Sequence, residues 1–401
     1  MENNMTILST EMFEKATKNN FTVEHAVEML MACTSFRTLS QKLNAFSNGK
    51  DIKKLLINGL CEHHPEKNPE TISRNVRNWL SDRQNKIQKK DAIEICFILD
   101  LDFEASNTLV AMISEEALHW RNPDEIPYIF ALYNKLSFNT AVELDKKIKQ
   151  QLSVHISANR EKSFTNVVKK EIIKIKSENE LVDYVVENYA RLNSYHNTAF
   201  ELFCEMMKTL EFPLENDNID DGYLAENKKY SVGKIVQAYM HREDIPELDT
   251  KDHFPKSETA KTRRKDAKTA YSAIQRSVAQ NWPSETMISR IFNRNADVTR
   301  KILILLFLAT FDVGSTAEND DLLEWDAEYE KSGDEIFEEF YMGMNQMLEN
   351  CGFVGLDPRS PFDWIVIFCM CIDDIYEIDG VFTDFLRILY PKNENGNESQ
   401  E

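Results

Sequence analysis

The sequence predicts an all-α protein, and two observations support this class. Gly and Pro each account for only 11 of the 401 residues, and segments that alternate strictly between apolar and polar residues are scarce. Apolar residues instead recur at spacings of three and four, in stretches rich in the good helix formers Leu, Glu, Lys and Met. With 42% hydrophobic residues, the chain has the composition of a folded globular protein.

The sequence also indicates a cellular compartment. Its longest apolar run, residues 302–311, is far too short to cross a bilayer, and no signal-peptide core follows the first residues. The seven Cys are scattered and odd in number, which suits a reducing compartment. We expect a cytoplasmic protein that does not interact with a membrane.

The net charge of −20 is unevenly distributed along the chain. Residues 36–90 and residues 251–301 each hold 12 Lys and Arg against 5 Asp and Glu, whereas residues 302–401 hold 4 against 23. Basic regions in an otherwise acidic protein are typical of a protein that binds a polyanion such as DNA. The alternative is that these basic regions pair with the protein's own acidic segments.

The first basic region contains an amphipathic helix, predicted over residues 70–83 (ETISRNVRNWLSDR). Its apolar side chains occupy about a third of the helix circumference, and its polar ones lie opposite. The apolar set is Ile72, Val76, Trp79 and Leu80, and the polar set is Arg74, Arg77, Asn78 and Ser81. Arg and Asn are the side chains that pair bidentately with guanine and adenine edges. The alternative interpretation is an ordinary solvated helix face.

Two further helices are predicted after this one. The first has apolar residues at helical spacing, namely Ala92, Ile95, Cys96 and Leu99. A turn then leads to Asp102 or its neighbour, which begins the next helix. On the N-terminal side, a helix over residues 50–60 is followed by the nine-residue connection CEHHPEKNP.

This order of elements resembles the phage-repressor (XRE-like) helix-turn-helix family over residues 50–112. The matching pieces are TISRNVRNWLSDRQ, AIEICFILDL and DFEASNTLV. The resemblance implies a helix that enters a DNA groove, with base-edge contacts from Ser73, Arg74, Arg77 and Asn78. It also implies that Arg83 lies on the DNA-binding surface and that Lys86, Lys89 and Lys90 contact phosphates. The nine-residue connection departs from the family, which joins its two groove-facing helices by three or four residues.

A second copy of this pattern follows at residues 281–310 (NWPSETMISRIFNRNADVTRKILILLFLAT). Aligning Ile288 with Ile72 sets three further polar residues on the predicted DNA-binding surface: Arg290 on Arg74, Asn293 on Arg77, and Arg294 on Asn78. The segments 118–131 and 356–369 also match at a constant offset, since Leu118 and Leu356 are 238 positions apart. Chance similarity between amphipathic helices is the alternative to duplication.

We therefore predict two related helical units, each containing a helix-turn-helix-like motif. The predicted boundaries are an N-terminal helical extension at 1–35, unit-forming segments at 36–150 and 256–390, a helical middle at 151–255, an acidic insertion at 313–340, and a disordered acidic tail at 391–401.

The predicted function is a sequence-specific transcriptional regulator that binds double-stranded DNA through these tandem units. We predict that it is not an enzyme and uses no metal or cofactor. The alternative is a helical interaction scaffold that retains the repressor-like fold and binds a protein partner through its acidic C-terminal half.

Three weaker clusters suggest other chemistry. Cys369 and Cys371 are predicted to be core residues, and the group of Cys61, His63 and His64 is predicted to be a solvated turn. The carboxylates of Asp373, Asp374, Glu377 and Asp379 could bind a divalent metal, but solvated acidic loops are far commoner.

The charge distribution leads to a first testable prediction. If the acidic insertion competes with DNA for the basic regions, removing residues 313–340 strengthens DNA binding, most clearly at low ionic strength. Titration of duplex DNA at several salt concentrations measures this effect. Unchanged binding at every salt concentration would contradict the competition.

Overall fold

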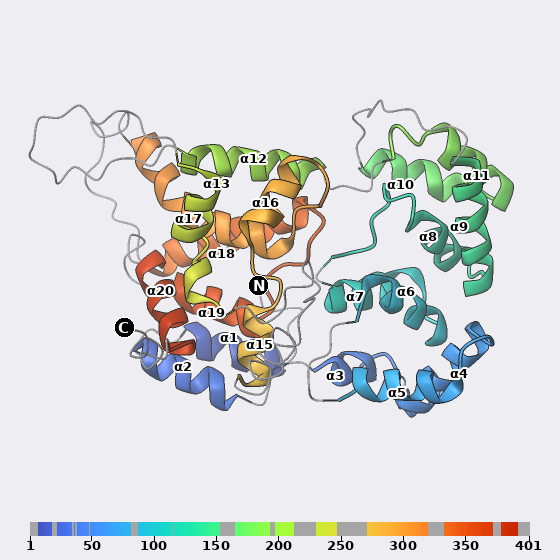
Figure 1. Cartoon of the computed structure of the whole chain (residues 1–401), viewed down its shortest axis with the longest axis horizontal. Helices are drawn as coiled ribbons and strands as arrows, with labels where there is room; N and C mark the ends of the chain where they lie inside the picture. Colours follow the sequence, from blue (N-terminus) through green and yellow to red (C-terminus); the bar gives the residue numbers. More distant parts are fainter. Residues whose placement is uncertain are drawn as a thin grey trace, which may run out of the picture. The chain divides into compact units, whose positions relative to one another are not determined.

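The computed structural model confirms the all-α class (Figure 1). It describes residues 7–17, 22–33, 36, 38–47, 49–81, 87–114, 116–152, 165–192, 197–211, 230–246, 271–319, 333–371 and 378–391. An isolated antiparallel bridge joins Glu116 and Phe353. No described helix is long and apolar enough to cross a membrane.

The chain forms two compact units. Unit 2 comprises residues 37–196 and 351–354, and unit 1 comprises residues 1–36, 197–350 and 355–401. The helices of unit 2 are α3 (Leu39–Asn44), α4 (Ile52–His63), α5 (Pro69–Trp79), α6 (Lys89–Ile98), α7 (Phe103–Ser114), α8 (Ile126–Tyr133), α9 (Phe138–Leu152), α10 (Thr165–Lys174) and α11 (Glu178–Glu187). Those of unit 1 are α1 (Ile7–Thr17), α2 (Val23–Ala32), α12 (Asn197–Glu211), α13 (Val232–Ala238), the 3₁₀ helix η2 (Arg242–Asp244), α15 (Ala273–Ala279), α16 (Glu285–Phe292), α17 (Arg300–Asn319), α18 (Gly333–Asn350), α19 (Pro361–Met370) and α20 (Ile378–Leu389).

This division differs from the boundaries predicted from the sequence. Residues 1–35 do not stand apart, because α1 packs on α19 and α2 packs on α20 within unit 1. The indole nitrogen of the buried Trp364 donates to the carbonyl of Met12, 3.0 Å away. The middle segment 151–255 is likewise shared, with α10 and α11 in unit 2 and α12 and α13 in unit 1. The apolar faces of these helices pack within the two units, so residues 151–255 do not form a separate domain.

Helix α6 forms the centre of the unit 2 core and packs against α4 and α7. Its residues Ala92, Ile95 and Cys96 are fully buried, as their helical spacing predicted. The next helix also begins where expected, because the Asp102 carboxylate accepts the backbone N–H of Ala105 at 2.8 Å. A carboxylate acceptor at the first turn satisfies a donor that the helix itself leaves unpaired.

Helix α5 packs against α4 with the predicted face. The Asn68 side chain caps its first turn, Pro69 occupies the first helical position, and the Ile72 and Val76 side chains are buried. Pro is suited to this position because it lacks the N–H that the first turn leaves unpaired.

The connection between α4 and α5 is shorter than the sequence indicated. Helix α4 continues to His63, so residues 64–68 form a five-residue connection in place of the nine expected. The extension has a physical cause, since the His63 ring stacks on Phe138 with centroids 4.4 Å apart and hydrogen-bonds Glu94.

In unit 2 a carboxylate near the start of α8 organises the preceding loop. Glu125 accepts the backbone N–H of His119 at 2.7 Å and pairs with the Lys89 ammonium at 2.9 Å. Lys89 also donates to the carbonyl of Ala117 at 2.8 Å, and the Asn107 side chain accepts the N–H of Leu118 at 2.8 Å.

Unit 1 contains the same set of bonds, 238 positions further along the chain for the loop residues. Asp363 accepts the N–H of Asp357 at 2.8 Å and pairs with Arg300 at 2.7 Å. Arg300 donates to the carbonyl of Gly355 at 2.9 Å, and the Asn345 side chain accepts the N–H of Leu356. Lys89 and Arg300 each occupy the first position of their helix, α6 and α17.

The predicted acidic insertion overlaps two helices. Residues 313–319 belong to α17 and residues 333–340 to α18, and Phe340 is buried. Because removing Phe340 would open the core, the deletion proposed from the sequence must be confined to residues 320–332, which lie outside the described residues. The predicted tail at 391–401 also lies outside them, apart from Pro391.

The buried pair in unit 1 gives a stability prediction. Replacing Arg300 with Met leaves the Asp363 carboxylate buried without its cation, and we expect the free energy of unfolding to fall by about 3–5 kcal/mol. The matched change Lys89→Met should cost less, because the side chains of Lys89 and Glu125 are 18% and 10% exposed, against 4% and 3% for Arg300 and Asp363. Chemical denaturation of the full chain measures both, and equal losses would contradict this account.

Candidate nucleic-acid interface

The polar face of α5 lies on the surface of unit 2. Arg74, Arg77 and Asn78 are exposed, and Ser73 is half-buried. The Arg77 Nε donates to the carbonyl of Ser73 at 3.2 Å, which holds the guanidinium stem along its own helix. The structure therefore brings all four predicted base-contacting residues together on one helix surface.

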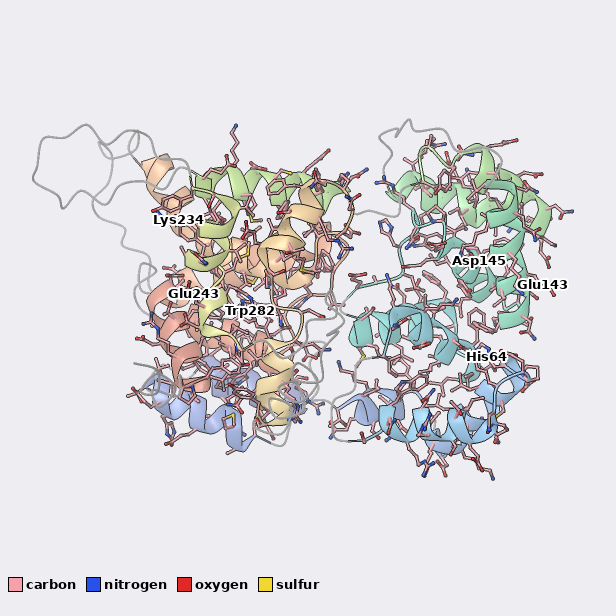
Figure 2. The ribbon with its side chains drawn as sticks, viewed as in Figure 1. His64, Glu143, Asp145, Lys234, Glu243 and Trp282 are labelled. Carbon is pink, nitrogen blue, oxygen red and sulfur yellow. The ribbon has the colours of Figure 1, made fainter. Side chains whose placement is uncertain are left out.

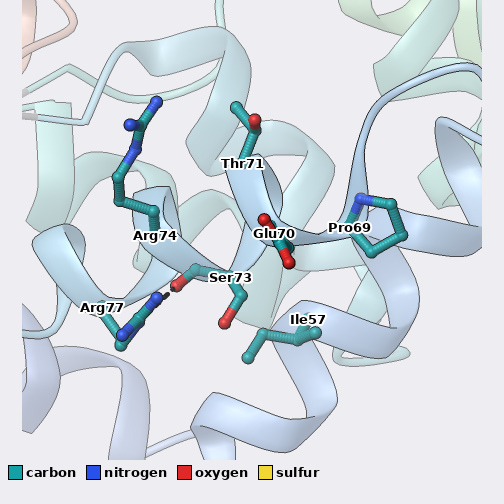
Figure 3. Close-up of a pocket in the computed structure, with 7 residues that line it drawn as sticks. All are labelled: Ile57, Pro69, Glu70, Thr71, Ser73, Arg74 and Arg77. Atoms are coloured by element: carbon teal, nitrogen blue, oxygen red, sulfur yellow. Dashed lines mark hydrogen bonds between the residues drawn. The ribbon is translucent and has the colours of Figure 1, made fainter.

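A groove of about 570 Å³ runs beside this surface, between α4 and α5 (Figure 3). The lining residues are Ile57, Pro69, Glu70, Thr71, Ser73, Arg74 and Arg77. Ile57 is the residue that α4 contributes, and the other six come from the first two and a half turns of α5. The groove is therefore lined mainly by polar side chains, with one carboxylate and two guanidinium groups.

Helix α4 adds positive charge that the sequence analysis did not assign to the interface. Lys53 and Lys54 are exposed and lie one turn before Ile57, so helical spacing sets them on the Ile57 side of α4. Lys50 is also exposed, immediately before the helix. The sequence contained a sign of this charge, because Lys53 and Lys54 stand four and three positions before the apolar Ile57.

The lysines predicted to contact phosphates differ in their exposure and in their partners. Lys90 is exposed, as a phosphate contact requires. Lys89 is engaged within unit 2, because its ammonium pairs with Glu125 and Glu116 and donates to the carbonyl of Ala117. Arg83 and Lys86 lie outside the described residues.

The segment predicted to be a second copy presents a different surface on α16. Arg290 and Asn293 are exposed, and Asn293 donates to the carbonyl of Ser289 at 2.9 Å. Arg294 is instead held by α12, where its guanidinium lies 3.8 Å from the centroid of the Phe200 ring and donates to the Asn197 side chain at 2.5 Å. The guanidinium of Arg294 is therefore engaged within unit 1.

Further aromatic packing fixes α16 to α12. The Phe292 and Phe203 ring centroids are 5.0 Å apart, and Phe203 is fully buried. Arg294 lies two positions after Phe292, the last residue of α16, and has a positive φ of 56°, so the chain turns away from the helix at this residue. The equivalent residue of the first copy, Asn78, is still helical and exposed.

The Cys61, His63 and His64 group is not the solvated turn that the sequence indicated. The His63 Nδ1 lies 3.0 Å from one Glu94 oxygen, and the His64 Nε2 lies 3.0 and 3.1 Å from the two Glu94 oxygens. Glu94 is buried on α6, so both imidazoles converge on a carboxylate in the core. Sequence reasoning missed Glu94 because it occupies an apolar helix face with no local sign of a partner. Figure 2 labels His64, which follows the last residue of α4.

The remaining clusters have structural roles where they are described. Cys369 is fully buried, as expected of a core residue, and burial raises the pKa of its thiol well above the ordinary value. Asp379 pairs with the Nε2 of the buried His241 at 3.1 Å. Asp373, Asp374 and Glu377 lie outside the described residues. Among the described residues, no group of three or more His, Cys, Asp or Glu is arranged to hold a metal ion.

A comparison of the chain with protein-family models, curated proteins and solved structures gives no match.

The contrast between the two helices leads to a stability prediction. Arg294→Ala removes a ring contact and a hydrogen bond, so we expect a loss of about 1–3 kcal/mol in the free energy of unfolding. Arg74→Ala removes only an exposed side chain and should stay within about 0.5 kcal/mol of the parent. Thermal unfolding of the full chain compares the two. A core-like loss for Arg74→Ala would mean that Arg74 is structural.

Proposed function

We propose that the protein is a cytoplasmic, sequence-specific DNA-binding regulator, and that α5 of unit 2 is the helix that reads the DNA. The observation that carries this proposal is the division of α5 into two faces. Ile72 and Val76 are buried, while Arg74, Arg77 and Asn78 are exposed on a surface that adjoins the groove. A helix held by its apolar face can present the opposite face to the major groove without losing core contacts.

The exposed residue types suit direct readout. Arg pairs bidentately with guanine O6 and N7, and Asn pairs bidentately with adenine N6 and N7. In this proposal Arg74, Arg77 and Asn78 contact base edges. Lys53, Lys54 and Lys90 contact phosphates, which position the protein without specifying a sequence.

The acidic net charge is compatible with DNA binding. Affinity for DNA depends on the local field around the phosphates, which salt screens over about 10 Å at 0.1 M ionic strength. The segment 36–90 that carries the proposed interface has an excess of Lys and Arg over Asp and Glu. We therefore expect binding to weaken steeply with added salt.

We further propose that the chain contains an internal duplication and that only the first copy keeps its DNA-reading surface. The matched bonding patterns around Glu125 and Asp363 support common ancestry of the two segments. The packing of Arg294 on α12 supports divergence of the second copy. Superposition of residues 36–150 on 256–390 tests the duplication. An unrelated topology of the two segments would contradict common ancestry.

The interaction scaffold remains the second candidate. The observation that favours it is the internal use of predicted DNA-contacting cations, since Lys89 and Arg294 are both engaged by their own units. In this alternative, the exposed face of α5 contacts an acidic protein.

Selection from random duplex DNA at several salt concentrations tests the proposal. We expect one enriched motif with the parent chain. Arg74→Ala and Arg77→Ala should each weaken binding by about 1–3 kcal/mol and relax the preference at one position. Lys54→Ala should weaken binding to all sequences equally and lower the salt dependence by about one counterion.

Two controls separate α5 from general charge effects. Lys146→Ala removes an exposed cation from α9 of the same unit and should leave the enriched motif and the affinity unchanged. Arg290→Ala should also have no effect if only the first copy reads DNA. No enrichment at any salt concentration would overturn the regulator in favour of the scaffold.

A further inference from the structure

We propose that Glu94 is a positioning residue for α5, because it holds His63 and His64 at the point where α4 turns into α5, and that this hold depends on pH. The effect on DNA rests on the proposed function, whereas the effect on the α4–α5 connection does not.

The geometry links the core of unit 2 to the start of the connection. Glu94 comes from α6, and both of its oxygens face imidazole nitrogens of the α4 end at 3.0–3.1 Å. The third element is α9, whose Phe138 ring stacks on His63 and meets the His64 ring edge-on. Helices α6 and α9 therefore both contact the two consecutive histidines at the end of α4.

The close approach of α4 to α6 makes this contact possible. A Cβ built at Gly59 would lie 2.6 Å from the Ile98 side chain, so this position of α4 accepts only a glycine without rearrangement. One turn later, His63 reaches Glu94 on the same helix α6.

The held residues lie at the start of the connection that leads to α5. The backbone N–H of His64 donates to Leu60, and its carbonyl accepts the N–H of Lys67, both at 3.0 Å. Pro69, the first residue of α5, follows two positions after Lys67. Fixing His64 therefore fixes the connection from which α5 starts.

The hydrogen-bonding capacity of the histidines makes the hold sensitive to protons. His64 meets carboxylates at both ring nitrogens, since Nε2 contacts Glu94 and Nδ1 lies 3.4 Å from Glu66. A neutral imidazole has one N–H and can donate to only one of them, whereas an imidazolium donates to both. Imidazoles change charge between about pH 5 and pH 8. We therefore expect the hold to tighten as pH falls from about 8 to about 6.

Glu94 sets the acidic limit of this behaviour. Burial acts to raise the pKa of Glu94, but the hydrogen bonds and the charge interactions with His63 and His64 together outweigh it, so the pKa lies below the ordinary value. A carboxylate with a lowered pKa contributes stability that is present above its unfolded-state pKa, about 4.3, and is lost as pH falls through the lowered value. Above its unfolded-state pKa, Glu94 therefore stays ionised in the folded protein and remains an acceptor for both imidazoles.

Other ionisable groups surround the cluster. Glu66, in the connection, contacts His64. Burial and the Glu94 charge raise the pKa of Asp91 on α6, whereas the charges of Lys67 and Lys90 act to lower it. Burial raises the pKa of Tyr128 on α8 to about 12, with Asp145 on α9 and Glu94 adding to the rise. The phenol therefore stays neutral throughout the tested range.

Hydrogen exchange of the full chain without DNA tests the positioning role directly. The measured segment is 60–72, at pH 6 and pH 8 after correction for intrinsic exchange. For the parent chain we expect greater protection at pH 6. In Glu94→Gln and in His64→Gln this difference should shrink by at least half. The glutamine in His64→Gln still offers Glu94 an N–H donor, so this variant tests the proposal even if Glu94→Gln fails to fold.

The matched control is Glu143→Gln, which removes the same charge from an exposed position on α9 (Figure 2). It should leave the pH dependence of segment 60–72 unchanged. Equal protection at both pH values in the parent, or an unchanged difference in His64→Gln, would overturn the proposal.

DNA binding by the same variants tests the functional consequence. We expect the parent to bind more tightly at pH 6 than at pH 8, and His64→Gln to lose at least half of that ratio, with Glu143→Gln as the control. If exchange responds but no variant binds DNA, the positioning role stands and the proposed function fails. If DNA binds but exchange does not respond, the positioning role alone fails.

Discussion

A buried carboxylate that serves a backbone amide and a cation at once is the interaction on which each unit depends. Glu125 and Asp363 lie where a loop enters an apolar helix, and each holds that loop through one N–H. A cation from the first position of another helix, Lys89 or Arg300, then neutralises the carboxylate. Since a lone buried charge is costly, carboxylate and cation must be kept together, and two helices are thereby held at a fixed spacing.

This constraint explains why neighbouring residues of one type have different roles. Lys89 and Lys90 are adjacent, yet the first is used within the unit and the second is exposed. The same separation appears between the copies, where the aligned residues Asn78 and Arg294 are exposed and packed, respectively. A basic residue in a basic segment is therefore not by itself evidence of contact with an external anion.

The sequence predicted what depends on local periodicity and missed what depends on distant partners. The buried faces of α5 and α6 followed from helical spacing, because Ile72, Val76, Ala92 and Ile95 need only an apolar neighbour. The length of α4 did not follow, since His63 is kept helical by contacts with a carboxylate 31 positions away and with the Phe138 ring. The internal pairing of Lys89 was missed for the same reason, because Glu125 is brought to it only by the tertiary fold. The charge and spacing of residues along the chain do not show which distant side chains come into contact in the fold.

The packing of Arg294 on α12 has a consequence for operator symmetry. If only α5 of each chain reads bases, a single molecule recognises a short, non-repeated sequence. A palindromic operator would then need two chains related by a two-fold axis, with half-sites about one helical turn of DNA apart. Occupancy of such an operator would rise with the square of protein concentration at low saturation, so a gene controlled in this way would respond sharply to small changes in protein abundance.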